Sequence, residues 1–538
     1  MKQKINLQLM ATLTGGLLFN YLFWMEKQAI NLLIYTIFIL TIILMDKEKS
    51  KNIKSYLAGA SLLLASLLVV FNKSALTVIT WYISLAIVIG ITHFQLLRSI
   101  FTIILAAILQ FVTAPVNLVK KILGARFSGM FFKPLLSSFK YIIIPLIAIT
   151  FFITLYSAAN NIFASYVEQF FSGINTFINN IFNFLFADLN LPRFLHIILG
   201  IVLAAAIFIR LKDLELEKAE SGCNEQLIRQ RRNKKNRSVF YNLSHIFAGS
   251  LLKRKTALKT ENIIGIISFS ALNLLILALN LIDISTLWLG ETTSMNASYS
   301  EALHDGAEAL IFSIIMAMLV IVYFFSGNLN FYSKNRALRL LAYLWIFQNA
   351  FLIASVLLRD LHYISALGLT YKRIGVMVFL LLCIIGLITV YLKVSRQKTF
   401  FYLCKVNGFA WYVLLLVFSF INWDVFIVSY NINHKESIRL DFDHLIGFSD
   451  KTLPLLHQNK QLFSKYLGTS VYASRREYDP QTQSNQLKRT TDEEQKLAFE
   501  NVLKERISIF REEYNHGSWL SWNYRDWQTQ QYLLKNRL

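Results

Sequence analysis

The chain has 538 residues, a mean hydropathy of +0.47 and a formal net charge of +22. Apolar residues make up 55% of it and charged residues only 16%, whereas soluble domains carry about a quarter charged residues. This composition excludes one large soluble domain and indicates an integral membrane protein that contacts the lipid bilayer.

The positive charge is unevenly distributed. Residues 431–538 hold 16 Lys and Arg against 14 Asp and Glu, so the excess lies between the apolar stretches. Lys and Arg in such loops mark the cytoplasmic side of a membrane protein. We therefore expect no nucleic-acid partner.

Apolar stretches follow one another as far as residue 427. About 20 apolar residues match the thickness of a bilayer, and an α-helix satisfies its own backbone there. We expect an all-α fold: a polytopic transmembrane helical bundle of about 12 spans (range 11–13) with a small helical C-terminal extramembrane domain. The expected spans are 9–25, 29–45, 56–72, 75–93, 98–114, 140–158, 194–210, 263–283, 306–325, 337–358, 374–393 and 407–427. Tryptophans near the ends of these spans are expected to be interfacial anchors, namely Trp24, Trp81, Trp288, Trp411 and Trp423.

Three regions are expected: N-terminal transmembrane hairpins at 1–114, a main transmembrane region at 115–427 and a polar helical tail at 428–538. The loop 210–260 carries 13 Lys and Arg against 5 acids, which predicts a cytoplasmic location. Counting spans onward from it places the tail outside the cytoplasm, which in bacteria means the outer side of the inner membrane.

The first spans give conflicting predictions. The basic loop 115–140 falls outside when spans are counted from the N-terminus, but inside when they are counted back from 210–260. We expect one early span to be a half-helix or an interfacial segment.

The segment 161–190 repeats apolar residues at spacings of three and four, with Asn at other positions. This pattern predicts an amphipathic helix in the membrane interface; a further span with one polar side is the alternative.

In the tail, 474–490 is expected to be a loop and 492–514 a helix. The aromatic end at 519–527 is expected either to pack on the tail helices or to lie against the membrane.

Catalytic motifs are missing from the sequence. It has no phosphate-binding G-x-x-x-x-G-K-[ST], no H-E-x-x-H and no G-x-S-x-G. The cysteines Cys223, Cys383 and Cys404 lie far apart, which argues against a zinc site or disulfide framework. We expect no metal and no other cofactor.

Polar residues near membrane depth are costly there and are therefore candidate functional residues. They form three clusters in the sequence. The first contains Asn280, Asp283, Trp288, His304, Asp305 and Glu308; the second contains Asn349, Ser355, Arg359, Asp360, His362, Tyr363, Thr370 and Arg373; the third contains Asn422, Asp424 and Asn431. The predicted topology puts all three on one side, where Arg359 is expected to pair with Asp283, Asp360 or Asp424. Two interpretations remain open, a polar site for an ion, solute or lipid head group and a structural network that holds helix ends together.

Several of these positions lie in segments that resemble those of a known family. The segments 156–163, 279–283, 304–306, 349–373 and 424–454 are similar to those of bacterial integral membrane proteins in the domain-of-unknown-function 4173 family and the related 4153 family. The resemblance implies a polytopic membrane protein and assigns no reaction, cofactor or catalytic residue.

We expect a non-enzymatic component of the membrane: a scaffold, a sensor-associated subunit or a part of an envelope system that binds a membrane or envelope protein through the tail. The alternatives are a secondary transporter or channel and a membrane enzyme acting on a lipid or isoprenoid carrier through His304, Asp305, Glu308 and Arg359.

Overall fold

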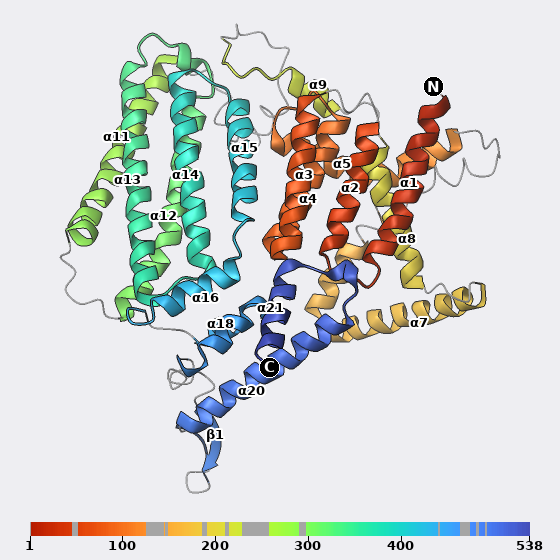
Figure 1. Cartoon of the computed structure of the whole chain (residues 1–538). Coiled ribbons are helices and arrows are strands. Elements are labelled where there is room, and N and C mark those ends of the chain that lie inside the picture. Colours follow the sequence, from red (N-terminus) through yellow and green to blue (C-terminus); the bar gives the residue numbers. More distant parts are fainter. Residues whose placement is uncertain are drawn as a thin grey trace.

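The computed structural model describes residues 2–45, 52–124, 145, 149–185, 191–209, 215–228, 258–289, 297–438, 442–462, 474–479, 484–489 and 492–538. These residues are helical almost throughout, which confirms the predicted class (Figure 1). Eight described helices are long and apolar enough to cross a membrane: Ile53–Asn72, Ala75–His93, Ile100–Ile122, Leu191–Phe208, Leu258–Trp288, Arg336–Leu367, Tyr371–Ser395 and Phe400–Phe418.

The first bundle joins the N-terminal helices to one later helix. It consists of α1 (Lys2–Phe23), α2 (Ile30–Met45), α3 (Ile53–Asn72), α4 (Ala75–His93), α5 (Ile100–Gly124) and α8 (Leu191–Phe208). Its core contains small residues beside large ones, so the helices approach closely. Trp81 is buried in this core and donates to the Thr36 hydroxyl over 2.8 Å. The prediction that Trp81 is an interfacial anchor is therefore wrong.

The second bundle has a separate apolar core. It consists of α11 (Leu258–Asp283) with the π-helical turn η2 (Ile284–Trp288), α12 (Ala297–Phe324), the 3₁₀ turn η3 (Asn328–Phe331), α13 (Arg336–Leu367) and α14 (Tyr371–Ser395). Figure 1 shows the two bundles beside each other.

Helix α15 (Phe400–Phe418) connects the bundles. On one face the Tyr412 hydroxyl donates to Ser61 of α3 and shares a hydrogen bond with Ser84 of α4, both 2.8 Å long. On the other face the Asn407 amide donates to Thr389 of α14 over 2.9 Å. Polar groups inside a membrane protein are satisfied by such partners on neighbouring helices. The predicted last span 407–427 is wrong at its end, because the helix stops at Phe418 and a new one begins at Trp423.

The elements after α15 form one unit, which we call the tail platform. It comprises α16 (Trp423–Asn433), α17 (Phe442–Ile446), the 3₁₀ turn η4 (Asp450–Thr452), α18 (Leu453–Gln458), α20 (Asp492–His516), the 3₁₀ turn η7 (Trp519–Ser521) and α21 (Tyr524–Lys535). A shared apolar core holds it together and includes Ile364 from the last turn of α13 and Leu369 from the α13–α14 connection. The strands β1 (Ser474–Asp479) and β2 (Ser484–Arg489) pair antiparallel where a loop is predicted, with Ser474 opposite Arg489.

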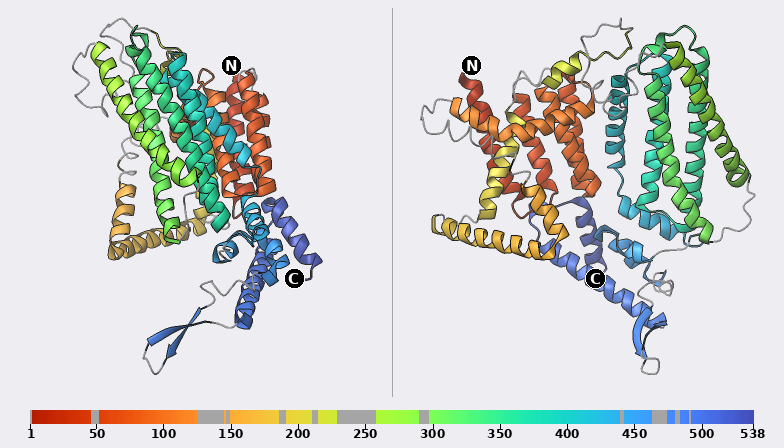
Figure 2. Two further views of the ribbon diagram at one scale, coloured as in Figure 1. Left: turned by 90° about the vertical axis from the view of Figure 1, so that its left-hand side faces the viewer. Right: turned by 180° about the vertical axis from the view of Figure 1, so that it is seen from behind.

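The molecule has two ends. The tail end carries the platform, the α1–α2, α3–α4 and α13–α14 turns and the amphipathic helix α7 (Asn161–Leu185); the opposite end carries α9 (Glu215–Ser221) and the α12–α13 and α14–α15 turns (Figures 1 and 2). We call the second the basic end, because its described residues include Lys121, Lys334, Arg336, Lys393, Arg396 and Lys398.

Helix α5 stays at the basic end along its whole length. The Glu220 carboxylate of α9 accepts two backbone N–H groups just before α5 begins, at 2.6 and 3.0 Å. In its middle, the Gln110 amide donates to the Ala206 carbonyl, 3.3 Å away near the C-terminus of α8, and Lys121 near its end bonds to Gln8 in α1. Both ends of α5 therefore lie on the same side, although its length and composition suit a span. A half-helix or interfacial segment among the early spans stays a prediction, and the position of α5 makes it the candidate.

Candidate functional site

The polar residues of α11 lie along its contact with α13. Asn273 and Asn280 are seven residues apart and so share one helix face. The Asn273 amide donates to the Leu341 carbonyl over 3.0 Å and its oxygen accepts from Gln348 over 3.0 Å. The Asn280 amide donates to the Gln348 carbonyl over 3.2 Å. We call this row of buried amides the α11–α13 seam.

An ion pair closes the seam at the tail end. Arg359 binds Asp283, whose side chain is 1% exposed, while that of Arg359 is 14% exposed. Of the three carboxylates that the sequence allows for Arg359, the structure selects Asp283 rather than Asp360 or Asp424. Two charges buried this deeply need each other, because either one alone is costly in a low-dielectric environment.

A second contact joins the first two predicted clusters. The Trp288 indole N–H donates to the Ser355 hydroxyl over 3.2 Å, and its ring stacks on Phe351 with centroids 5.5 Å apart. Trp288 belongs to η2, whose wider turn continues α11 past Asp283. Asp283 and Trp288 of the first cluster therefore meet residues of the second cluster at one place.

Asn349 lies outside the seam. It is buried, and its amide donates to the Trp345 carbonyl of its own helix over 2.8 Å. Its role is therefore local to α13.

The turn between α13 and α14 gathers four more candidates. Thr370 caps α14 by accepting from the Arg373 backbone N–H over 3.4 Å. The Arg373 guanidinium donates to the Gly368 carbonyl, lies 5.8 Å from the centre of the Tyr363 ring and interacts electrostatically with the buried Asp360. Gly368, Tyr363 and Asp360 therefore surround the Arg373 guanidinium.

Asn431 fastens this turn to the platform. Its amide accepts from the Leu369 N–H at 2.6 Å and donates to the Leu369 carbonyl at 2.9 Å. Gly368 has a φ of +82°, and a Cβ atom there would lie 2.6 Å from the Asn431 side-chain oxygen. Glycine is therefore required by both conformation and space.

Asp424, also in the third cluster, makes a further contact between the platform and the second bundle. It accepts hydrogen bonds from the Tyr371 hydroxyl of α14 and from the Ser449 hydroxyl of the platform. The third cluster thus joins the platform to the second bundle instead of completing the Asp283–Arg359 site.

The remaining candidates of the first cluster are His304, Asp305 and Glu308. They belong to α12, but their side chains lie outside the described part of the structure. Their predicted role stays a prediction.

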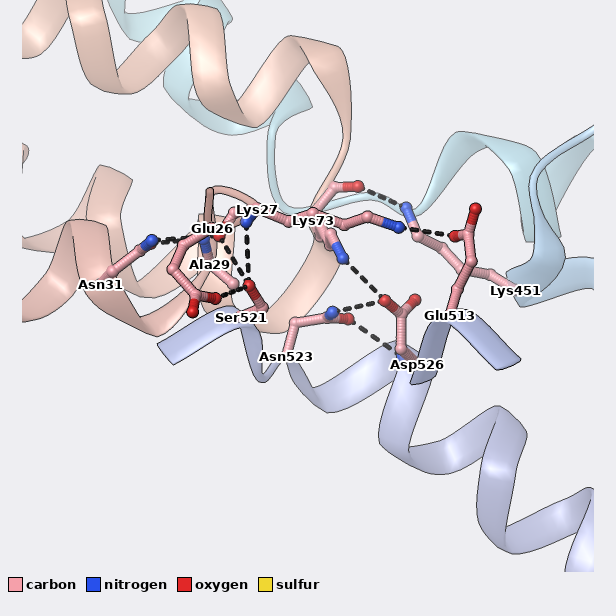
Figure 3. A network of polar contacts seen from close by, with 10 residues as sticks. All are labelled: Glu26, Lys27, Ala29, Asn31, Lys73, Lys451, Glu513, Ser521, Asn523 and Asp526. Carbon is pink, nitrogen blue, oxygen red and sulfur yellow. Dashed lines mark hydrogen bonds and ion pairs between the residues drawn. The ribbon is translucent and has the colours of Figure 1, made fainter. Parts of the chain in front are cut away.

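Sequence reasoning missed a contact network between the platform and the first bundle (Figure 3). The Ser521 hydroxyl donates to Glu26 over 2.6 Å and accepts from the Lys27 backbone N–H over 2.9 Å. The Lys27 amine pairs with Glu513 of α20 over 2.6 Å. The Asn31 side chain holds the turn in shape by donating to the Lys27 carbonyl over 3.0 Å.

A second part of this network centres on the α3–α4 turn. The Lys73 amine pairs with Asp526 over 2.8 Å, and Asn523 donates to the same carboxylate over 2.6 Å (Figure 3). The Lys451 amine donates to the Lys73 carbonyl over 2.6 Å. Burial lowers the pKa of Lys451, and the carboxylates of Asp424 and Asp526 oppose that shift. Lys451 therefore lies between the contacts to the second bundle and those to the first.

The partners that join the platform to the first bundle are between 378 and 495 residues apart in the chain. The sequence gives only a weak signal for them, the acids and tryptophans of an otherwise polar tail. Among the residues that the structure describes, no group of three or more His, Cys, Asp or Glu is placed to hold a metal ion.

A comparison with known families identifies a family model that matches most of the chain. Residues 58–459 match the family model described as "Domain of unknown function (DUF4153)", a range that begins within α3 and ends just after α18. This is the second of the two families that the sequence resembles. No curated protein and no solved structure matches the chain.

Proposed function

The chain belongs to the DUF4153 family, and we propose that it is a non-enzymatic scaffold of the bacterial inner membrane that presents its tail platform to another envelope protein. The observation that carries the proposal is that the platform contacts both bundles. Asn431 and Asp424 hold it to the second bundle, while Ser521 and Asp526 hold it to the first. A platform fixed in this way has a defined orientation over the membrane.

The charges support a topology with the basic end in the cytoplasm. With α5 left at that end, we assign the crossings among the described residues to α1 to α4, the helix Ile149–Ala159, α8 and α11 to α15, eleven in all. An odd number puts the N-terminus and the platform on opposite sides. The basic loops 115–140 and 210–260 then share the cytoplasmic side, in agreement with the positive-inside rule.

The surface offered to a partner is on α20, which extends away from the bundles with the hairpin beyond it (Figure 1). Leu497 and Ile509 on α20 are 59% and 48% exposed. Because the platform holds α20 in place, these two side chains are offered to a partner in a fixed orientation.

Photo-crosslinking in cells tests this proposal. A photoreactive amino acid replaces Leu497 or Ile509 and, as a matched control, Phe347, which is 70% exposed on α13. We expect a discrete protein adduct from the platform positions and none from the lipid-facing control. Adducts from the control alone, or from no position, would contradict a scaffold that works through the platform.

One observation favours a second candidate function, a pathway for a small solute or ion. Asn273 and Gln348 lie well inside α11 and α13, and the side-chain oxygens of Asn280 and Gln348 are buried without a hydrogen-bond donor among the described residues. Buried acceptors at membrane depth are a feature of transport sites. Flux into proteoliposomes that Gln348→Leu abolishes and Asn349→Leu preserves would establish this function; equal flux in empty liposomes would reject it.

A further inference from the structure

The helix α7 has an apolar half whose described side chains are left exposed by the described part of the chain. Ile162, Tyr166 and Phe170 are 70%, 67% and 64% exposed, and Phe171 is 52% exposed. A Cβ atom added to Gly173 would have nothing within 4 Å. A water-exposed stripe of this size is unfavourable, so it requires an apolar environment.

The chain turns sharply into this helix. Asn160 caps it, because its side-chain oxygen accepts from the backbone N–H groups of Ile162 and Phe163 at 2.9 and 3.2 Å. The helix before the cap, Ile149–Ala159, is apolar, and α8 follows soon after α7 ends. Figures 1 and 2 show α7 running across the tail end, where α8 begins.

Neighbouring aromatic residues mark this level as a membrane interface. Trp24 follows α1, and the Arg193 guanidinium near the start of α8 lies 6.0 Å from the centre of its ring. His196 stacks on Phe19, with ring centres 4.9 Å apart. Tryptophan and arginine are characteristic of the region where lipid head groups meet the acyl chains.

The polar half of α7 is almost uncharged. Residues 161–185 contain Glu168 and no Lys or Arg; the rest of the polar half consists of Asn, Ser, Gln and Thr. Binding of an interfacial helix depends on its buried apolar area and on attraction between its cations and anionic lipids. In α7 only the first of these terms is available.

We propose that α7 lies in the lipid interface at the tail end and that its depth of insertion follows lipid packing rather than lipid charge. The bulky side chains Phe170, Phe171 and Tyr166 enter where lipids are loosely packed. Because only five residues separate α7 from α8, which packs tightly on α1, a change in the depth of α7 is transmitted to the first bundle. This inference does not depend on the scaffold function.

Fluorescent labelling in proteoliposomes tests it, with an environment-sensitive probe on single cysteines in a background without the native ones. Phe170→Cys probes the apolar half, Ser172→Cys on the opposite half is the matched control, and Leu281→Cys on α11, 57% exposed, reports contact with lipid. We expect brominated lipid to quench the probe at 170 and aqueous iodide to quench it several-fold less than at 172. The probe at 170 should lie deeper in loosely packed dioleoyl lipid than in saturated lipid. Added phosphatidylglycerol should leave its depth unchanged.

Three results would overturn the proposal. Equal iodide quenching at 170 and 172 would place α7 in water, and protection of 170 from both quenchers would mean that protein covers it. A depth that follows phosphatidylglycerol content instead of packing would show that charge controls it. The probe at 281 verifies in each sample that the chain is folded and inserted.

Discussion

The two bundles are held together by different means. In the first, backbones touch: a Cβ atom on Gly16 would lie 2.9 Å from the Cα atom of Ile201, and one on Gly200 would lie 2.9 Å from the Gly16 carbonyl. In the second, the amides of Asn273 and Gln348 bond across α11 and α13. Substitutions that add side-chain volume should therefore destabilise the first bundle most. Substitutions that remove polar side chains should destabilise the second bundle most.

The largest effect is expected from Asp283→Ala. It leaves Arg359 buried without its partner, which should cost about 3–5 kcal/mol of unfolding free energy. Unfolding in detergent measures the change. The double variant Asp283→Leu/Arg359→Leu should recover most of the lost unfolding free energy. A double variant as unstable as the single one would show that the loss does not come from leaving Arg359 without its partner.

Gly16→Val tests the close approach of α1 and α8. The added side chain meets backbone atoms that cannot rotate away, so we expect a loss of about 1–3 kcal/mol. The same unfolding measurement applies. Gly173→Ala is the matched control, because space is open there and alanine should be neutral or stabilising by up to about 1 kcal/mol; equal losses in both would refute the glycine contact.

Lys73→Ala should have a smaller effect, confined to the platform. The Lys73–Asp526 pair is about one-fifth exposed on each side, and such a pair contributes roughly 1 kcal/mol or less. We expect faster proteolysis of α21 in the variant at low salt, with the difference from the wild type shrinking as salt rises. Lys27→Ala, which removes a more exposed pair, should change the rate less.

The smallest effect concerns pH at the basic end. A hydrogen bond from Lys405 holds the pKa of Glu225 below its ordinary value of 4.5. A lowered folded-state pKa stabilises the protein above the ordinary value, and this contribution is lost as the pH falls through the folded pKa. Melting temperatures should therefore fall less between neutral and acidic pH in Glu225→Gln than in the wild type; identical profiles would contradict the pairing.

The sequence predicts the helices well, because apolar length and period fix them locally. The loop charges predict one misassigned early span, but they do not say which; only the contacts of Gln110 and Lys121 point to α5. The end at Phe418 was missed because six of the nine residues 419–427 are apolar. The hairpin was missed because its sequence is polar, with no alternation of apolar residues.

For the candidate site, the sequence identifies Asp283 and Arg359 as possible partners, since charges at membrane depth require one. It does not identify the contacts of Ser521 or Asp526 with the first bundle. These contacts depend on how the platform packs over both bundles, and no local sequence pattern predicts that packing.

The most direct test of the central claim is a disulfide between Lys27→Cys and Ser521→Cys, in a background without the native cysteines. The Ser521 hydroxyl is 2.9 Å from the Lys27 backbone nitrogen, so the two residues are neighbours, and disulfides form in the periplasm but not in the cytosol. A platform docked on the first bundle outside the cytoplasm predicts that the bond forms in growing cells without added oxidant. Thiols that remain free in cells and join only after oxidation of lysed membranes would contradict the topology, and thiols that never join would contradict the docking.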